Sequence, residues 1–256
     1  MTGLRTTLRS MPEFGSPAAV AVQVLAAPVF TALFYLLMAD WGVGGSAAVA
    51  ALAALTGSCA VQAVTLVASA LAEDRFEGTL PYLISMGGHA VRLWAGRMAA
   101  MLAVAVAGGC ASLAATLLTG RLTQGGAGPV LGAVVLLVVS SLASLGVGLC
   151  VAAVSLVCTD ALFLANLVGF VLPLVCGLVA PVSVFPQPLR CLAYAVPVSW
   201  MTDAARAVAD GRVRDAAAAA GCGIAVGIGW LVLAVAVTAV CEHRSRRDAN
   251  IDALGI

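Results

Sequence analysis

Residues 47–72 read AAVAALAALTGSCAVQAVTLVASALA, and no Asp, Glu, Lys or Arg occurs among them. About 20 consecutive apolar residues are enough for a helix to cross a bilayer, since a helix satisfies its backbone polar groups internally. The stretch is therefore long enough to be a membrane span. The charged run Glu73-Asp74-Arg75-Phe76-Glu77 follows it directly, and there the chain is expected to return to water.

Five other segments share this length and character. The six predicted spans lie within residues 18–39, 47–72, 98–119, 129–157, 161–180 and 216–241, and none of them contains an acidic or basic side chain. Hydrophobic residues make up 62% of the chain and charged residues 10%, whereas soluble domains are about 45–50% apolar and about 25% charged. The sequence therefore predicts an all-α integral membrane protein with six transmembrane helices, in which residues 1–256 form a single domain.

The arginines indicate how the spans are oriented. All 13 Lys and Arg residues are Arg, and an excess of basic residues in short loops is typical of the cytoplasmic side. With the N-terminus inside, the inner segments hold more arginines than the outer ones, and most outer arginines lie in the long segment 181–215, where the rule has less force. We therefore predict cytoplasmic N- and C-termini. Residues 1–17, which include Arg5 and Arg9, are expected to form an interfacial helix.

Two longer segments lie outside the predicted spans. Residues 73–97 are predicted to be cytoplasmic and begin with the charged run. Residues 181–215 are predicted to be external, and they are apolar but interrupted by Pro181, Pro186, Pro188 and Pro197. A proline inside a helix removes a hydrogen bond and kinks the chain. This segment is therefore expected to form short helices that lie against the outer membrane face or re-enter it.

Several residues are expected to serve packing rather than chemistry. The amides of Gln62 and Asn166, within the spans, favour hydrogen bonds between helices. Trp41, Tyr194 and Trp200 fit anchors at the membrane interface. Close helix packing is expected at Gly108, Gly109, Gly146, Gly148, Gly223, Gly227 and Gly229. The 8 cysteines contain no C-x-x-C spacing, and a pair between Cys191 and Cys222, both predicted to be external, stays open.

Several classes of chemistry lack the residues that they need. A P-loop requires a Lys, and the chain has none. The 2 histidines form no H-E-x-x-H motif, and no G-x-S-x-G motif occurs. Ion-driven carriers usually place charged residues inside their spans, and the predicted spans here are uncharged. We therefore expect no catalytic residue, no metal, no cofactor bound by this chain and no enzymatic activity.

Two motifs resemble those of type-2 ATP-binding-cassette transporter permeases. The family's first cytoplasmic loop is similar to Glu73-Asp74-Arg75-Phe76-Glu77-Gly78-Thr79-Leu80 followed by Gly96-Arg97. The family's external segment before the last span is similar to Pro188-Leu189-Arg190, Leu192-Ala193, Pro197, Asp203-Ala204 and Arg206. The sequence departs from the family at Pro81, where an acidic residue is frequent, and at Met86-Gly87, where Thr-Pro is frequent. The order of the motifs, the six spans and the length extend the resemblance to nearly the whole chain.

The resemblance implies the permease subunit of a bacterial exporter in the plasma membrane. It implies a homodimer that docks two copies of a separate cytoplasmic ATPase, which would bind the ATP and Mg. The implied ATPase-coupling loop contains Glu73, Asp74, Arg75, Phe76, Glu77, Gly78, Thr79, Leu80 and Arg92. The implied external gate segment contains Pro188, Leu189, Pro197, Asp203 and Arg206. The expected cargo is a small amphipathic compound, as in drug export or antibiotic resistance, and no substrate-binding residue is identified.

Other interpretations stay open at this stage. The chain could instead be an ATP-independent secondary carrier or lipid scramblase, or a membrane immunity or assembly protein that transports nothing. The charged run at residues 73–77 could be only a solvated helix end. Asp203 and Arg206 are one helical turn apart, and we expect them to form a local ion pair rather than a gate.

Overall fold

The computed structural model describes residues 16–42, 46–76, 88–122, 127–155, 158, 160–178 and 180–248. These residues form helices joined by short turns, and they include no strand. The elements are α2 (Pro17–Ala21), η2 (Val22–Ala26), α3 (Ala27–Gly42), α4 (Ala47–Phe76), α6 (Gly88–Leu118), α7 (Ala127–Ser155), α8 (Ala161–Val175), η4 (Val182–Val184), α9 (Gln187–Tyr194), α10 (Pro197–Ala209) and α11 (Val213–Asp248). The predicted all-α architecture is confirmed.

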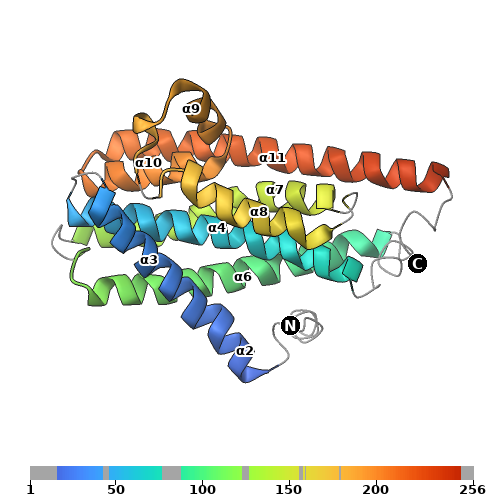
Figure 1. Cartoon of the computed structure of the whole chain (residues 1–256), viewed down its shortest axis with the longest axis horizontal. Coiled ribbons are helices and arrows are strands. Elements are labelled where there is room, and N and C mark those ends of the chain that lie inside the picture. The colour runs from blue at the N-terminus through green and yellow to red at the C-terminus, as the bar shows by residue number, and fades with distance from the viewer. Residues whose placement is uncertain are drawn as a thin grey trace.

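Five helical segments are long and apolar enough to cross a membrane. They are Ala18–Met38, Ala47–Ala70, Gly96–Leu118, Ala127–Ser155 and Val213–Thr238. In Figure 1 the long helices run along the bundle, and α4, α6 and α7 follow one another in alternating directions. These helices and their composition define an integral membrane protein with several crossings.

The predicted fifth span is shorter in the structure than in the sequence analysis. Helix α8 has 15 residues, which corresponds to about 22 Å at about 1.5 Å per residue, less than the ~30 Å of a bilayer core. Pro173 lies near its end. Gly177 follows with a φ of 82°, a left-handed conformation that commonly terminates a helix. The fifth span was predicted to extend to residue 180, but the helix ends at Val175.

Helix α4 is the centre of the bundle. It contacts α3, α6, α7, α8 and α10, and 78% of its apolar segment is buried, against 17% for the first span and for α11. Small side chains allow this, because α4 is rich in Ala and its partner α7 presents buried Ser140, Ser141 and Ser144. The core therefore forms around α4, and the first span and α11 lie at its periphery.

Glycines set the closest helix contacts, as predicted. A Cβ on Gly146 would lie 2.5 Å from the backbone N of Leu231, and a Cβ on Gly227 would overlap the carbonyl oxygen of Ala143. Helices α7 and α11 therefore touch backbone to backbone. The same prediction is confirmed at Gly108, Gly109, Gly148 and Gly223, where a Cβ would lie under 3 Å from a neighbouring atom. It is wrong for Gly229, because nothing lies within 4 Å of that position.

The first span contains a widened turn. In η2 the N–H of Ala27 donates to the carbonyl of Val22, five residues earlier. Pro28 follows immediately, and in a regular α-helix its ring would clash with the carbonyl four residues before it. The wider turn separates these groups, and the buried Pro28 then packs where Gly108 of α6 lacks a side chain.

Candidate functional site

The charged motif that begins at Glu73 lies partly inside α4. Its residues up to Phe76 continue that helix, and α6 begins at Gly88 rather than at residue 98. Residues 77–87 lie outside the described residues, as do the side chains of residues 71–95. The expectations for Glu77, Gly78, Thr79 and Leu80, and for the side chains of Glu73, Asp74, Arg75, Phe76 and Arg92, therefore stay predictions. The same holds for the interfacial helix, since residues 1–15 are not described.

Arg97 connects the two helices that bound this motif. It is buried, and its Nη2 donates to the carbonyl of Ala70 in α4 at 3.3 Å. The bond joins the start of the α6 span to the last turns of α4. The two helices that enter and leave the charged motif are therefore held together on the bundle side of it.

Prolines position the short helices of the segment 181–215. Pro197 is the first residue of α10, and Pro188 lies in the first turn of α9. Pro181 and Pro186 directly precede η4 and α9. The first turn of a helix tolerates proline because its N–H groups have no partner within the helix. The prediction of short helices in this segment is confirmed.

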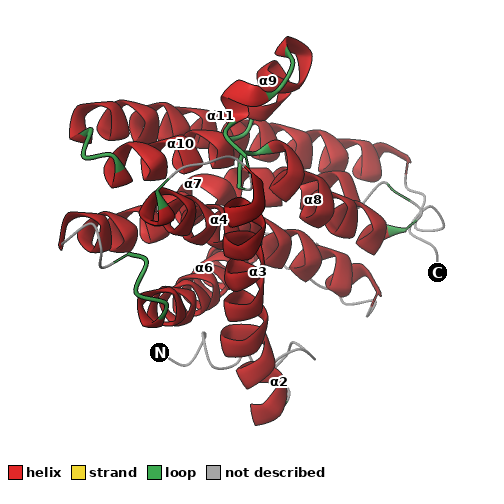
Figure 2. Ribbon diagram, turned by 60° about the vertical axis from the view of Figure 1, so that its left-hand side comes forward, coloured by secondary structure: helices red, strands yellow, loops and turns green. Residues whose placement is uncertain are grey.

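The two short helices differ in their surroundings. Most of α9 is exposed, and it projects from the bundle in Figure 2. Helix α10 instead contacts α4, α7 and α11. Its buried residues are Pro197, Val198, Ser199, Met201, Thr202, Ala204, Ala205 and Ala207. Helix α10 is therefore part of the core, whereas α9 lies on the outside.

Helix α10 also supplies hydrogen bonds to the carbonyl groups just past the end of the shortened α8. The hydroxyl of Thr202 donates to the carbonyl of Cys176 at 2.9 Å, and Nη2 of Arg206 donates to the carbonyl of Gly177. The last carbonyls of a helix lack partners within it, and they carry partial negative charge. A buried guanidinium is a suitable partner for them, although burial lowers the pKa of Arg206 below its usual value. Helix α10 thus caps α8 from the side.

Asp203 is the centre of a polar network. Its Oδ1 lies 3.3 Å from Nη1 of Arg206, so the predicted local ion pair is confirmed. Its Oδ2 accepts a 2.8 Å hydrogen bond from the hydroxyl of Tyr194. Burial, reinforced by this carboxylate, raises the pKa of Tyr194 to about 12. No local spacing predicts Tyr194 as a partner of Asp203, because Tyr194 lies in a separate helix.

Two tryptophans fix the turn between α9 and α10. Nε1 of Trp200 donates to the carbonyl of Tyr194 at 2.9 Å, and Nε1 of Trp230 in α11 donates to the carbonyl of Ala195 at 2.7 Å.

The predicted gate residues do not all lie together. The exposed Pro188 and Leu189 lie on α9, away from the network around Asp203. Cys191 and Cys222 are free thiols. Of the predicted gate residues, Pro197, Asp203 and Arg206 therefore belong to α10, which packs in the core. Pro188 and Leu189 belong to the exposed start of α9.

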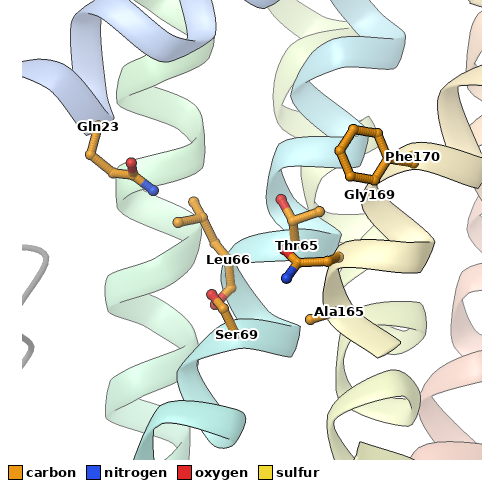
Figure 3. Close-up of a pocket in the computed structure, with 8 residues that line it drawn as sticks. Gln23, Thr65, Leu66, Ser69, Ala165, Gly169 and Phe170 are labelled. Atoms are coloured by element: carbon orange, nitrogen blue, oxygen red, sulfur yellow. The ribbon is translucent and has the colours of Figure 1, made fainter. Parts of the chain in front are cut away.

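A polar groove crosses α4 between the first span and α8. Its volume is about 340 Å³, and it is lined by Gln23, Thr65, Leu66, Ser69, Ala165, Asn166, Gly169 and Phe170. Figure 3 shows Gln23 on one side of α4 and the residues of α8 on the other. The groove lies toward the end of α4 that leads to the charged motif.

The polar groups of this groove are not equally satisfied. The hydroxyls of Thr65 and Ser69 donate to carbonyls of their own helix, at 3.1 Å and 3.3 Å. The carboxamides of Gln23 and Asn166 find no hydrogen-bond partner among the described residues. Gln23 is the residue that sequence reasoning missed, although a carboxamide inside an apolar span is itself a signal of function. The groove therefore offers two free amides at membrane depth.

The fold and these sites define a multi-pass membrane protein with a buried helical cap at one end and a charged motif at the other. Residues 8–209 match the family described as ABC-2 type transporter, a range that includes both motifs and all of α10. The chain therefore belongs to the ABC-2 type transporter family and is a permease component of an ABC transporter, which works with an ATPase subunit. No curated protein and no solved structure matches the chain.

Proposed function

We propose that this permease exports a small amphipathic compound across a bacterial plasma membrane, driven by a separate ATPase. In this proposal two copies of the chain dock two copies of the ATPase, which holds the ATP and Mg, and both termini are cytoplasmic. The capped α8 counts as the sixth crossing, because α10 occupies the outer part of the bundle that α8 does not reach. The chain itself performs no hydrolysis.

The continuity of α4 carries this proposal. Its 30 residues contain no proline, and their length is about 45 Å at about 1.5 Å per residue. One end continues into Glu73 of the charged motif, the middle lines the groove, and the other end contacts α10. A displacement of the motif by an ATPase would therefore move the groove and the cap through one rigid element.

The composition of the groove supports the proposed class of cargo. Phe170 and Leu66 supply apolar surface, while Gln23 and Asn166 supply donors and acceptors. Small-molecule sites are usually concave, mostly apolar and supplied with a few polar groups that fix orientation. An amphipathic compound matches this combination, whereas a multivalent ion would find no charged ligand among the lining residues.

Transport in proteoliposomes tests the proposal. The permease is reconstituted with the ATPase that co-purifies with it, and uptake of an amphipathic cationic dye into inside-out vesicles is measured with ATP and with a non-hydrolysable analogue. We expect uptake only with hydrolysable ATP and only with both subunits. Uphill transport by the permease alone would instead support a secondary carrier, and dye exchange in both directions without nucleotide would support a scramblase.

A further inference from the structure

The widened turn of the first span leaves one backbone carbonyl without its usual donors. In an α-turn the carbonyl of Gln23 would accept from the N–H of Ala27, and in a π-turn it would accept from residue 28. The N–H of Ala27 donates to the carbonyl of Val22 instead, and Pro28 has no N–H. The carbonyl of Gln23 is therefore available to a group outside its own helix.

Packing holds this turn in its widened form. Pro28 is buried, and a Cβ on Gly108 of α6 would lie 2.8 Å from Cγ of its ring. The same Cβ would lie 2.9 Å from Nε2 of Gln62 in α4. The ring thus occupies space that only a glycine leaves between these helices. Single π-turns inside α-helices occur frequently at functional sites, and this one is fixed by its neighbours.

The available carbonyl belongs to a residue of the polar groove. Gln23 lines the groove, and in Figure 3 its side chain extends from the first span toward α4. On α4, the hydroxyls of Thr65 and Ser69 already donate their hydrogens to carbonyls of their own helix. Each hydroxyl oxygen keeps its lone pairs, so toward the groove it can only accept a hydrogen bond. The groove therefore combines hydroxyl and carbonyl acceptors that have no donors of their own.

The two carboxamides of the groove do not reverse this excess of acceptors. Gln23 and Asn166 each carry a donating NH₂ and an accepting oxygen, and rotation can present either end. The other lining side chains are apolar apart from Thr65 and Ser69, and none of the lining residues is charged. An acceptor left unpaired away from water is costly. A ligand that brings donors removes this cost, and a ligand without donors does not.

We infer that the groove selects its cargo by hydrogen-bond donors, and that it prefers a compound with N–H groups, such as a protonated amine, over one of equal charge without them. The apolar part of the cargo lies against Leu66 and Phe170, which line the same groove. A site built to accept from an N–H rejects an analogue that lacks it, because the acceptors of the site then stay unpaired. This inference rests on the proposed function, whose cargo class it narrows, but donor recognition can be measured without transport.

Binding of two matched dyes to the full-length permease tests the inference. Both dyes are cationic rhodamine esters of equal charge; the nitrogens of one keep a hydrogen each, and those of the other are fully alkylated. Fluorescence anisotropy measures their binding to the permease in lipid nanodiscs, and empty nanodiscs correct for partition into lipid. We expect the Kd of the N–H dye to be about tenfold lower, the effect of one hydrogen bond. Equal Kd values, or no saturable binding of the N–H dye, would overturn the inference.

A pair of variants places the recognition in the groove. Thr65→Val keeps the shape of the side chain but removes its acceptor, and we expect the preference for the N–H dye to fall about threefold, with binding of the alkylated dye unchanged. The control is Thr238→Val on α11, whose hydroxyl also donates to the carbonyl four residues before it, and its preference should equal that of the wild type. An undiminished preference in Thr65→Val, or an equal fall in both variants, would overturn the assignment to the groove.

Transport separates this inference from the proposed function. Selective binding without ATP-driven uptake of either dye would reject the proposed function alone. ATP-driven uptake with equal Kd values for the two dyes would reject the donor selectivity alone.

Discussion

The hydroxyl of Thr202 in α10 donates a 2.9 Å hydrogen bond to the carbonyl of Cys176, just past the end of α8. These residues are 26 positions apart, and the bond is buried. Arg206, which also lies on α10, binds the carbonyl of Gly177. The two bonds make α10 the cap of α8. The segment 181–215 is therefore a structural part of the bundle and not an appended loop.

Replacing Arg206 is expected to loosen this cap. Arg206→Met leaves the carbonyl of Gly177 and the carboxylate of Asp203 without their partner. Removing one member of a buried pair costs about 1–3 kcal/mol, and thermal unfolding in detergent would show it. The control is Arg212→Met, whose ion pairs with Asp210 and Asp215 are exposed and screened by water, so its loss is expected to have little effect. Equal melting temperatures for the two variants would contradict the capping role.

High pH is expected to weaken the contact between α9 and α10. The pKa of Tyr194 is raised from 10.0 to about 12, so the folded protein favours the neutral phenol. Its contribution to stability is complete below pH 10 and is lost as the pH rises toward about 12. Tyrosinate absorbance would follow the titration, and thermal unfolding would follow the loss. Tyr194→Phe lacks the ionisable group, and a loss of the same size in that variant would count against Tyr194.

Adding one methyl group is expected to separate α7 and α11 at one position only. A Cβ in Gly227→Ala would overlap the carbonyl oxygen of Ala143, so the helices must move apart, at a cost of about 1–3 kcal/mol. In Gly229→Ala nothing lies within 4 Å, and the better helix propensity of Ala favours folding by about 0.5–1 kcal/mol. Opposite signs of the change in melting temperature are expected. The same sign in both variants would show that packing does not decide the effect.

Removing the acidic side chains of the charged motif is expected to uncouple the ATPase. The triple variant Glu73→Ala, Asp74→Ala and Glu77→Ala should insert and fold normally, because these residues follow the apolar segment of α4. Co-purification of the ATPase and ATP-driven transport should both be lost. Asp210→Ala with Asp215→Ala removes exposed carboxylates from the opposite end of the bundle and should leave both intact. Undiminished co-purification of the triple variant would refute the coupling assignment.

Much of the fold follows from the sequence, because membrane helices can be recognised as long runs of apolar residues. The apolar segments of α4 and α7 were predicted to within a few residues, since each run ends at a charge or a turn. The predicted end of the fifth span, at residue 180, is wrong, because α8 ends at Val175. Residues 176–180 are as apolar as the helix before them, and only the contacts of Thr202 and Arg206 show that the helix has already stopped.

The candidate sites were predictable where they depend on local spacing and not where they depend on distant neighbours. The pair of Asp203 and Arg206 is one turn of a helix, so spacing alone predicted it. Tyr194 joins that pair across the turn that Trp200 and Trp230 hold in place, a geometry that no local pattern encodes. The groove depends on three separate helices meeting, and only its single amide on α8, Asn166, attracted attention in the sequence.

The widened turn before Pro28 also sets the direction in which Gln23 points. Each residue of an α-helix turns the chain by about 100°, and η2 holds one residue more per turn than a regular helix does. If Pro28→Ala allowed the turn to tighten, everything N-terminal to it would rotate about the helix axis relative to α4. The amide at position 23 would then leave the groove while the sequence of the groove stayed the same. Pro28 thus determines how the N-terminal part of the first span is rotated about its own helix axis.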